Sequence, residues 1–271
     1  QALALATCCL LALLAGGCAV DEPAPTMPCF APAARDPQEL LLAGSGAVLA
    51  PTRLLVEAYR AAHPGAKVRV APSIGTGGAL RALRDGAIDV GLAARGLSSA
   101  ERQELRVTPL ATIPLVLALH RRHPLPKGLD QRVAARLVAD ATARFGDGTA
   151  VVPVYRQRGD AVDKALAIHT PALARAIDKA RSEHRGLTRY TDQSLLASLR
   201  RIPGALGVVD AGTLRLSAAP LRSIELDPRG PGEPPHLDLA LLTRTPESKR
   251  VAAFLSFVQS PAARRLLVER G

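Results

Sequence analysis

The chain has 271 residues and a formal net charge of +11, and its length fits one large domain or two of ordinary size. Apolar residues make up 48% of it, enough for a packed core, so the composition excludes a wholly disordered chain. Aromatic residues make up only 3%, which disfavours nucleic-acid modules that stack bases on exposed rings. All but five of the 35 basic residues are Arg, and we interpret most of them as solvated surface, with a role toward anions as the alternative.

The first residues are apolar and uncharged, and they predict an export signal. Residues 2–15 are shorter than the ~18–20 residues that a membrane-spanning helix needs. They lead into Leu14-Ala15-Gly16-Gly17-Cys18, which resembles the bacterial lipoprotein processing box, where small residues precede a lipidated cysteine. We therefore expect residues 1–17 to be a signal peptide and Cys18 to carry lipid. An ordinary signal peptide with a chance cysteine is the alternative.

The remaining cysteines and the next segment fit a tethered, exported protein. Cys8 and Cys9 would leave with the signal, so Cys29 remains alone and we expect neither an intramolecular disulfide nor a cysteine metal site. Residues 18–37 are rich in Pro and Ala and predict an extended tether. The folded part is then expected in the periplasm or on the outer cell surface, anchored to the membrane.

Alternating apolar runs and amphipathic segments predict an α/β fold. The expected strands are residues 40–43, 67–71, 88–93, 115–119, 151–155, 207–209, 224–226 and 237–242. The expected helices are residues 51–62, 79–85, 132–145, 161–168, 171–183, 193–200, 247–258 and 262–269.

Motifs for catalysis or cofactor binding are incomplete. The segment Gly44-Ser45-Gly46-Ala47-Val48-Leu49 lacks the third glycine of a dinucleotide fingerprint, and Gly75–Ala79 is not followed by the Lys of a phosphate-binding loop. There is no G-x-S-x-G elbow and no H-E-x-x-H pair. His120 and His123 are interpreted as a solvated strand end rather than metal ligands. The sequence therefore predicts no enzyme, no cofactor and no metal site.

Three segments share one pattern, a strand followed by a glycine-rich or polar turn and a helix start: residues 44–51, 73–80 and 156–164. A helix N-terminus exposes unpaired backbone N–H groups and about half a positive charge. Several such turns facing one point would bind an anion without a metal. For any single turn, an ordinary strand-to-helix connection is the alternative.

These segments occur in the order found in the phosphate-binding (PstS-type) solute receptors of bacterial ABC importers, and residues 40–271 resemble that family. The stretches that carry the resemblance are Gly44-Ser45-Gly46 with Pro51, residues 62–68, residues 74–80, residues 85–91, residues 94–97, residues 152–156, residues 203–209 and residues 254–271. The resemblance implies a two-lobed periplasmic-binding-protein fold of type II, each lobe a wound mixed sheet flanked by helices. Lobe one would be residues 38–118 plus 215–271 and lobe two residues 119–214, with the ligand between them and the cleft closing on it.

Carried over by position, the resemblance implies the ligand-binding residues Ser45, Gly46, Thr76, Gly77, Arg95, Arg156 and Asp160. Thr76 would donate its hydroxyl and Gly77 its N–H group. Arg156 would pair with anion oxygens, which suits its rigid fork of donors. Arg95 is equally well interpreted as one partner of a surface or interlobe salt bridge.

The sequence departs from the family pattern in the second lobe. The motif R-x-x-G-S-G-T reads Arg156-Gln157-Arg158-Gly159-Asp160-Ala161-Val162, so both hydroxyls are lost. The first-turn hydroxyl positions are Ala47 and Val48, and each lost hydrogen bond costs about 1 kcal/mol. Asp160 would accept the proton of a hydrogen phosphate, repel a dianion, or cap the helix that follows it.

The resemblance implies a monomeric, lipid-anchored receptor for an inorganic oxyanion, with phosphate as the first candidate, that delivers it to an ABC permease. Matching Arg158-Gly159-Asp160 to the R-G-D of tungstate receptors keeps a tungstate or molybdate ligand open. The alternative function is a receptor-fold lipoprotein with a degraded oxyanion site that acts as a sensor or interaction protein. Nucleic acid is not an expected partner.

Overall fold

The computed structural model describes residues 36–123, 130–217, 220–226 and 233–270. The predicted signal peptide, Cys18, Cys29 and all but the last two residues of the predicted tether lie outside the described residues and stay predictions. Within the described residues, no helix is both long and apolar enough to cross a membrane.

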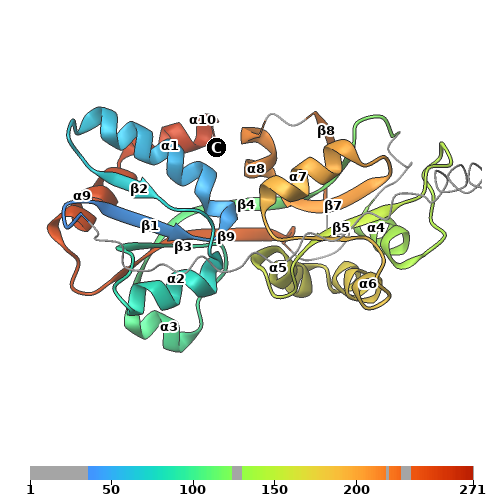
Figure 1. Ribbon diagram of the computed structural model, residues 1–271, viewed down its shortest axis with the longest axis horizontal. Coiled ribbons are helices and arrows are strands. Elements are labelled where there is room, and N and C mark those ends of the chain that lie inside the picture. The colour runs from blue at the N-terminus through green and yellow to red at the C-terminus, as the bar shows by residue number, and fades with distance from the viewer. Residues whose placement is uncertain (1–35, 124–129, 218–219, 227–232, 271) are drawn as a thin grey trace, which may run out of the picture.

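A single nine-stranded mixed sheet runs through the molecule in the order β2-β1-β3-β9-β4-β7-β5-β6, with β8 paired to β4 (Figure 1). Its first half holds the parallel strands β1 (Leu40–Gly44), β2 (Val68–Val70) and β3 (Val90–Ala93), with β9 (His236–Arg244) antiparallel to β3. The second half holds the parallel strands β5 (Val152–Arg156), β6 (Leu187–Arg189) and β7 (Ala205–Asp210), and also β8 (Leu221–Glu225).

The 16-residue strand β4 (Leu105–His120) belongs to both halves of the sheet. Its residues 105–114 pair with β9, and its residues 115–120 pair with β7 and β8. The chain therefore forms two lobes joined by a continuous strand. The residue limits that we expected for the lobes remain a prediction, and β8, at residues 221–225, pairs in the second half of the sheet.

Helices cover both faces of each lobe (Figure 1). In the first lobe they are α1 (Gly46–Ala62), α9 (Lys249–Val258) and α10 (Pro261–Arg270) on one face, and α2 (Gly75–Arg84) and α3 (Ser99–Glu104) on the other. In the second lobe they are α7 (Asp192–Arg201) and α8 (Ala211–Leu216) on one face, and α4 (Gln131–Ala139), α5 (Ala161–His169) and α6 (Pro171–Ser182) on the other. The predicted fold, two lobes of wound mixed sheet flanked by helices, is confirmed.

Two helices begin earlier than the sequence analysis predicts. Helix α1 begins at Gly46 rather than Pro51, because Val48, Thr52 and Leu55 form a buried stripe at helical spacing that extends back past the proline. Helix α2 begins at Gly75 rather than Ala79, so the predicted glycine turn is largely the first turn of the helix. Both glycine-rich segments therefore place helix N-termini directly after the strands.

Other boundaries also differ. Strand β4 starts ten residues before the predicted Leu115, because its first part pairs with β9 through a bulge between Pro109 and Ala111 that interrupts the apolar alternation. Helix α4 ends at Ala139 rather than residue 145, where the Asp140 carboxylate accepts a hydrogen bond from the Thr142 N–H group and holds a turn. The short elements α3, β6 and α8 were not predicted.

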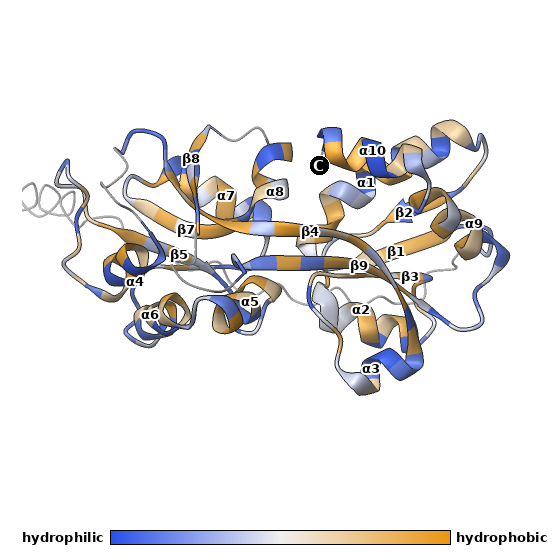
Figure 2. Cartoon of the chain, turned by 180° about the vertical axis from the view of Figure 1, so that it is seen from behind, coloured by the Kyte–Doolittle hydropathy of each residue, from blue (hydrophilic) through white to orange (hydrophobic). Residues whose placement is uncertain are grey.

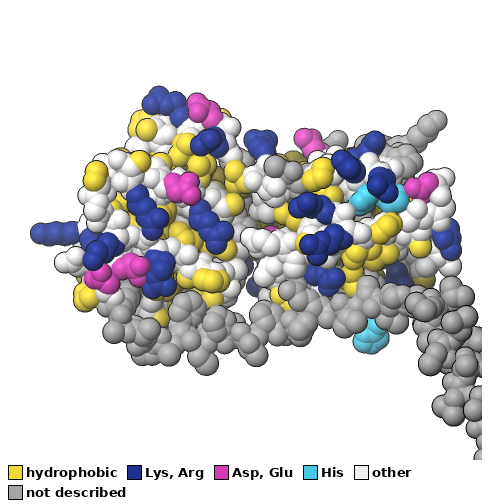
Figure 3. Space-filling model, turned by 45° about the horizontal axis from the view of Figure 1, so that its top comes forward, with side chains coloured by type: hydrophobic (Ala, Val, Ile, Leu, Met, Phe, Trp, Pro, Cys, Tyr) yellow, Lys and Arg dark blue, Asp and Glu magenta, His cyan; other side chains and the backbone are white. Residues whose placement is uncertain are grey.

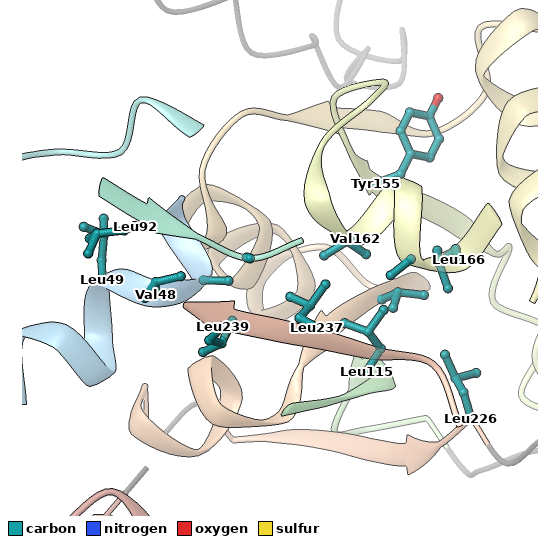
Figure 4. Close-up of a cluster of buried hydrophobic side chains, with 14 of the residues drawn as sticks. Val48, Leu49, Leu92, Leu115, Tyr155, Val162, Leu166, Leu226, Leu237 and Leu239 are labelled. Carbon is teal, nitrogen blue, oxygen red and sulfur yellow. The ribbon is translucent and has the colours of Figure 1, made fainter. Parts of the chain in front are cut away.

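The core follows the shared strands. Figure 2 shows apolar residues concentrated along the strands, with polar residues on the outer surfaces of the helices. In Figure 4, Leu237 and Leu239 of β9 lie between Val48 of the first lobe and Val162 of the second. These residues belong to one continuous buried cluster, so the two lobes share a core along β9.

Candidate functional site

Arg156 is the last residue of β5 and is only 7% exposed, although it carries a permanent charge. Its Nε donates a hydrogen bond to Asp160 Oδ2 at 3.0 Å, and its Nη1 donates to the Arg189 carbonyl oxygen at 3.4 Å. A cavity of about 20 Å³ lies behind it inside the second lobe, with room for little more than one water molecule. This cavity is therefore too small to hold an oxyanion beside the guanidinium.

Asp160 caps helix α5. Its Oδ1 accepts hydrogen bonds from the N–H groups of Val162 at 2.7 Å and Asp163 at 3.4 Å, while its other oxygen faces Arg156. The sequence left three roles open for Asp160, and this geometry shows one of them, the helix cap. The same carboxylate neutralises part of the charge of Arg156, which bears on how strongly the site attracts an anion.

Asp192, which the sequence analysis did not select, is the second carboxylate beside Arg156. It is the first residue of α7 and is 8% exposed, and its Oδ1 lies 3.6 Å from Arg156 Nε. Burial raises the pKa of Asp192, Arg156 opposes that shift, and the negative charge of Asp160 adds to it. The available signal was an acidic residue directly before the predicted helix 193–200, and the short strand β6 that would have completed a fourth strand-turn-helix segment was not predicted.

The N-terminus of α1 lies against Asp192 from the other lobe. A Cβ atom on Gly46 would collide with Asp192 Oδ2 and would lie 3.5 Å from Ser73 Oγ, so a side chain at this position fits only if the Asp192 carboxylate moves. Ser45 is the N-cap residue, but its hydroxyl makes no capping bond, and its N–H group donates to the Leu92 carbonyl oxygen at 2.8 Å. Ser45 and Gly46 of the first lobe therefore lie near Arg156 and Asp160 of the second lobe, with Asp192 between them.

The other predicted residues are engaged within the first lobe. The Thr76 hydroxyl oxygen accepts a hydrogen bond from the Ala94 N–H group at 3.3 Å, and Gly77 is exposed in the first turn of α2. Arg95 donates two hydrogen bonds to Glu101, at 3.0 and 2.9 Å, and this pairing is the main cause that lowers the pKa of Glu101 to about 2. Among the described residues, no hydrogen bond or ion pair joins these three residues to Arg156, so their roles toward a ligand stay predictions.

The groups gathered at this site are ones that bind anions. In the part of the chain that the structure describes, no group of three or more His, Cys, Asp or Glu side chains is placed to hold a metal ion. The site combines one buried guanidinium, two carboxylates and the N-termini of α1, α5 and α7. On the face shown in Figure 3, Lys and Arg side chains are spread over both lobes rather than gathered at one place.

Comparisons with known proteins agree with this architecture. A family profile described as a PBP superfamily domain matches residues 31–262. A search of curated protein sequences finds no match.

Three solved structures share the fold at low sequence identity. A protein assigned as a phosphate ABC transporter substrate-binding protein from Clostridium perfringens, with phosphate bound, matches with a TM-score of 0.69 and 14% identity, covering 86% of this chain and 97% of that one. An ABC-type phosphate transport receptor from Vibrio cholerae matches with a TM-score of 0.59 and 16% identity, covering 86% and 98%. The sulfate-bound regulatory domain of an OxyR2 variant from Vibrio vulnificus also matches, with a TM-score of 0.59, 16% identity and coverage of 84% and 95%.

Identity at this level shows the fold that these proteins share, while the family profile spans most of the chain. Together with the two lobes, the shared strands and the helix N-termini at the lobe boundary, it establishes that this chain belongs to the PBP superfamily.

Proposed function

We propose that this protein is a lipid-anchored extracytoplasmic receptor that binds an inorganic oxyanion, with phosphate as the first candidate, and delivers it to an ABC importer by closing its two lobes. The proposal assigns no catalytic activity. Two of the matched structures are described as phosphate transport proteins, one of them with phosphate bound, and they support phosphate as the first anion to test.

One observation carries the proposal. The buried guanidinium of Arg156 stands at the lobe boundary, on the side where α1 of the first lobe begins. A planar guanidinium and helix N-termini are the groups that bind tetrahedral oxyanions without a metal. Ser45, Gly46, Thr76, Gly77 and Arg95 are proposed to complete the site from the first lobe when a ligand is bound.

The binding test is calorimetric titration of the mature protein with phosphate, sulfate, molybdate and tungstate. We expect phosphate to bind, Arg156→Lys to weaken binding at least tenfold because the fork of donors is lost, and Arg156→Ala to abolish it. Arg158→Ala is the matched control, because Arg158 is an exposed neighbour that pairs with Asp178 on the surface. If none of the four anions gives heat or raises the melting temperature, the receptor proposal fails.

The anchoring proposal rests on Cys18 and is tested separately. Expressed with its signal, the wild-type chain is expected in the membrane fraction, and Cys18→Ser is expected to release it. Equal amounts of both proteins in the membrane fraction would contradict lipidation at this cysteine.

A sensor or interaction role is the second candidate, and one observation favours it. Two carboxylates already compensate Arg156, which weakens its attraction for an external anion. This candidate predicts that the wild-type protein leaves all four oxyanions unbound and that its partner is another macromolecule.

A further inference from the structure

The carboxylate of Asp192 connects the two lobes. It belongs to α7 of the second lobe, and its Oδ2 occupies the space that a side chain at Gly46 would fill in α1 of the first lobe. Its Oδ1 faces the guanidinium of Arg156, which the second lobe contributes. A buried carboxylate therefore lies between the two groups that the proposed function assigns to the ligand.

Several groups that favour an anion lie close to this carboxylate. Asp192 is in the first turn of its own helix, and its Oδ2 lies beside Gly46, the first residue of α1, so two helix N-termini are near it. Arg156 supplies a cation at 3.6 Å. The residue is more than nine-tenths buried, so little water screens these charges. Nearby Asp160 bonds to Arg156 directly and makes the local charge negative when both carboxylates are ionised.

We propose that Asp192 is a built-in competitor of the oxyanion, which occupies the ligand's position between Arg156 and the N-terminus of α1 until a ligand displaces it. The inference rests on the proposed function, because it assigns the same site. An entering oxyanion must separate Asp192 from Arg156 and from the N-terminus of α1 before it gains those contacts. Asp192 therefore sets the affinity of the site.

The first experiment measures phosphate affinity in Asp192→Asn, which keeps the size of the side chain and removes its charge. We expect Asp192→Asn to bind phosphate at least tenfold more tightly than the wild type. Asp178→Asn is the control for net charge, because Asp178 is half exposed and pairs with the exposed Arg158 and the largely buried Arg181 of the same lobe, and no ion pair joins it to Arg156 among the described residues. It is expected to leave the affinity unchanged.

The outcomes separate this inference from the proposed function. Wild-type binding with equal or weaker binding in Asp192→Asn would overturn the competitor role and leave the receptor function standing. Absence of oxyanion binding in both proteins would overturn the receptor function, and the inference with it.

A second experiment tests the contact without any ligand. Gly46→Ala is expected to lower the melting temperature in the wild-type background, because the new methyl group pushes the Asp192 carboxylate away from α1 and from Arg156. In the Asp192→Ala background the same substitution is expected to have less than half that effect. Equal effects in both backgrounds would show that Asp192 does not hold α1, and would overturn the interlobe contact.

Discussion

At the scale of single residues, the carboxylates of Asp192 and Asp210 near the lobe boundary are buried. Asp210, the N-cap of α8, is 2% exposed, and its Oδ1 accepts a hydrogen bond from the Thr213 N–H group at 2.7 Å. Burial raises the pKa of Asp210 to about 6, and the nearby charge of Asp192 acts in the same direction. Its ionised form is therefore costly in the folded protein, although its hydrogen bond favours ionisation.

This raised pKa predicts that Asp210 contributes less to stability at neutral than at mildly acidic pH. The proton on Asp210 contributes stability fully below the unfolded-state pKa, near 4, and this contribution is lost as the pH rises through about 6. The loss amounts to about 3 kcal/mol. Urea unfolding of wild type and Asp210→Asn at pH 4 and pH 7 measures it. The variant should lack this part of the pH dependence, and parallel pH profiles would contradict the assignment.

At the scale of elements, side-chain caps determine where several helices begin. Asp160 caps α5, Ser98 and Glu101 form a capping box on α3, and Thr191 and Ser194 form one on α7, next to Asp192. The cap on α7 fixes the backbone that carries Asp192. The capping box therefore holds the first turn of α7, and with it the position of Asp192.

The cap on α5 can be separated from the charge of Asp160. Asp160→Ser and Asp160→Ala both remove the ion pair with Arg156, but Ser is a good N-cap residue and Ala is not. We expect the Ser variant to exceed the Ala variant in free energy of unfolding by about 1 kcal/mol. Denaturant titration of the two proteins measures this difference, and equal stabilities would show that the capping bonds contribute nothing.

At the scale of the whole molecule, β4 and β9 make the two lobes one folding unit. Strand β4 pairs in both halves of the sheet, and the buried cluster around Leu115 and Leu237 contains side chains from both lobes (Figure 4). A substitution in this shared core is therefore expected to destabilise both lobes. Two lobes that met only through a polar interface would unfold independently.

Calorimetry tests whether the two lobes unfold as one unit. We expect a single thermal transition whose calorimetric and van't Hoff enthalpies agree. Leu237 is 1% exposed, so Leu237→Ala should lower the stability by about 2–5 kcal/mol and still give one transition. Two resolved transitions in either protein would show that the lobes unfold separately.

The parts of the fold that the sequence predicts depend on residues close together along the chain, and the parts that it does not predict depend on contacts between distant residues. The order of strands and helices, and the strand-turn-helix segments near Gly46 and Arg156, follow from apolar periodicity and turn residues that lie close together along the chain. The first part of β4 was missed because its pairing with β9, through a bulge, is a long-range contact that leaves no regular local pattern. The short helix α8 was missed because six residues are too few to show a helical stripe.

The sequence by itself determined the α/β class and the likeness to two-lobed solute receptors, and it predicted Arg156 and Asp160 as ligand-binding residues. Only the tertiary structure showed that Arg95 is bonded to Glu101, and that Asp192 lies between Arg156 and the glycine that begins α1. The physical reason is that side-chain periodicity acts within a few residues. The charged groups at the buried lobe boundary come from distant parts of the chain. The shared strands β4 and β9 determine which helix N-termini, and therefore which charges, lie next to each other there.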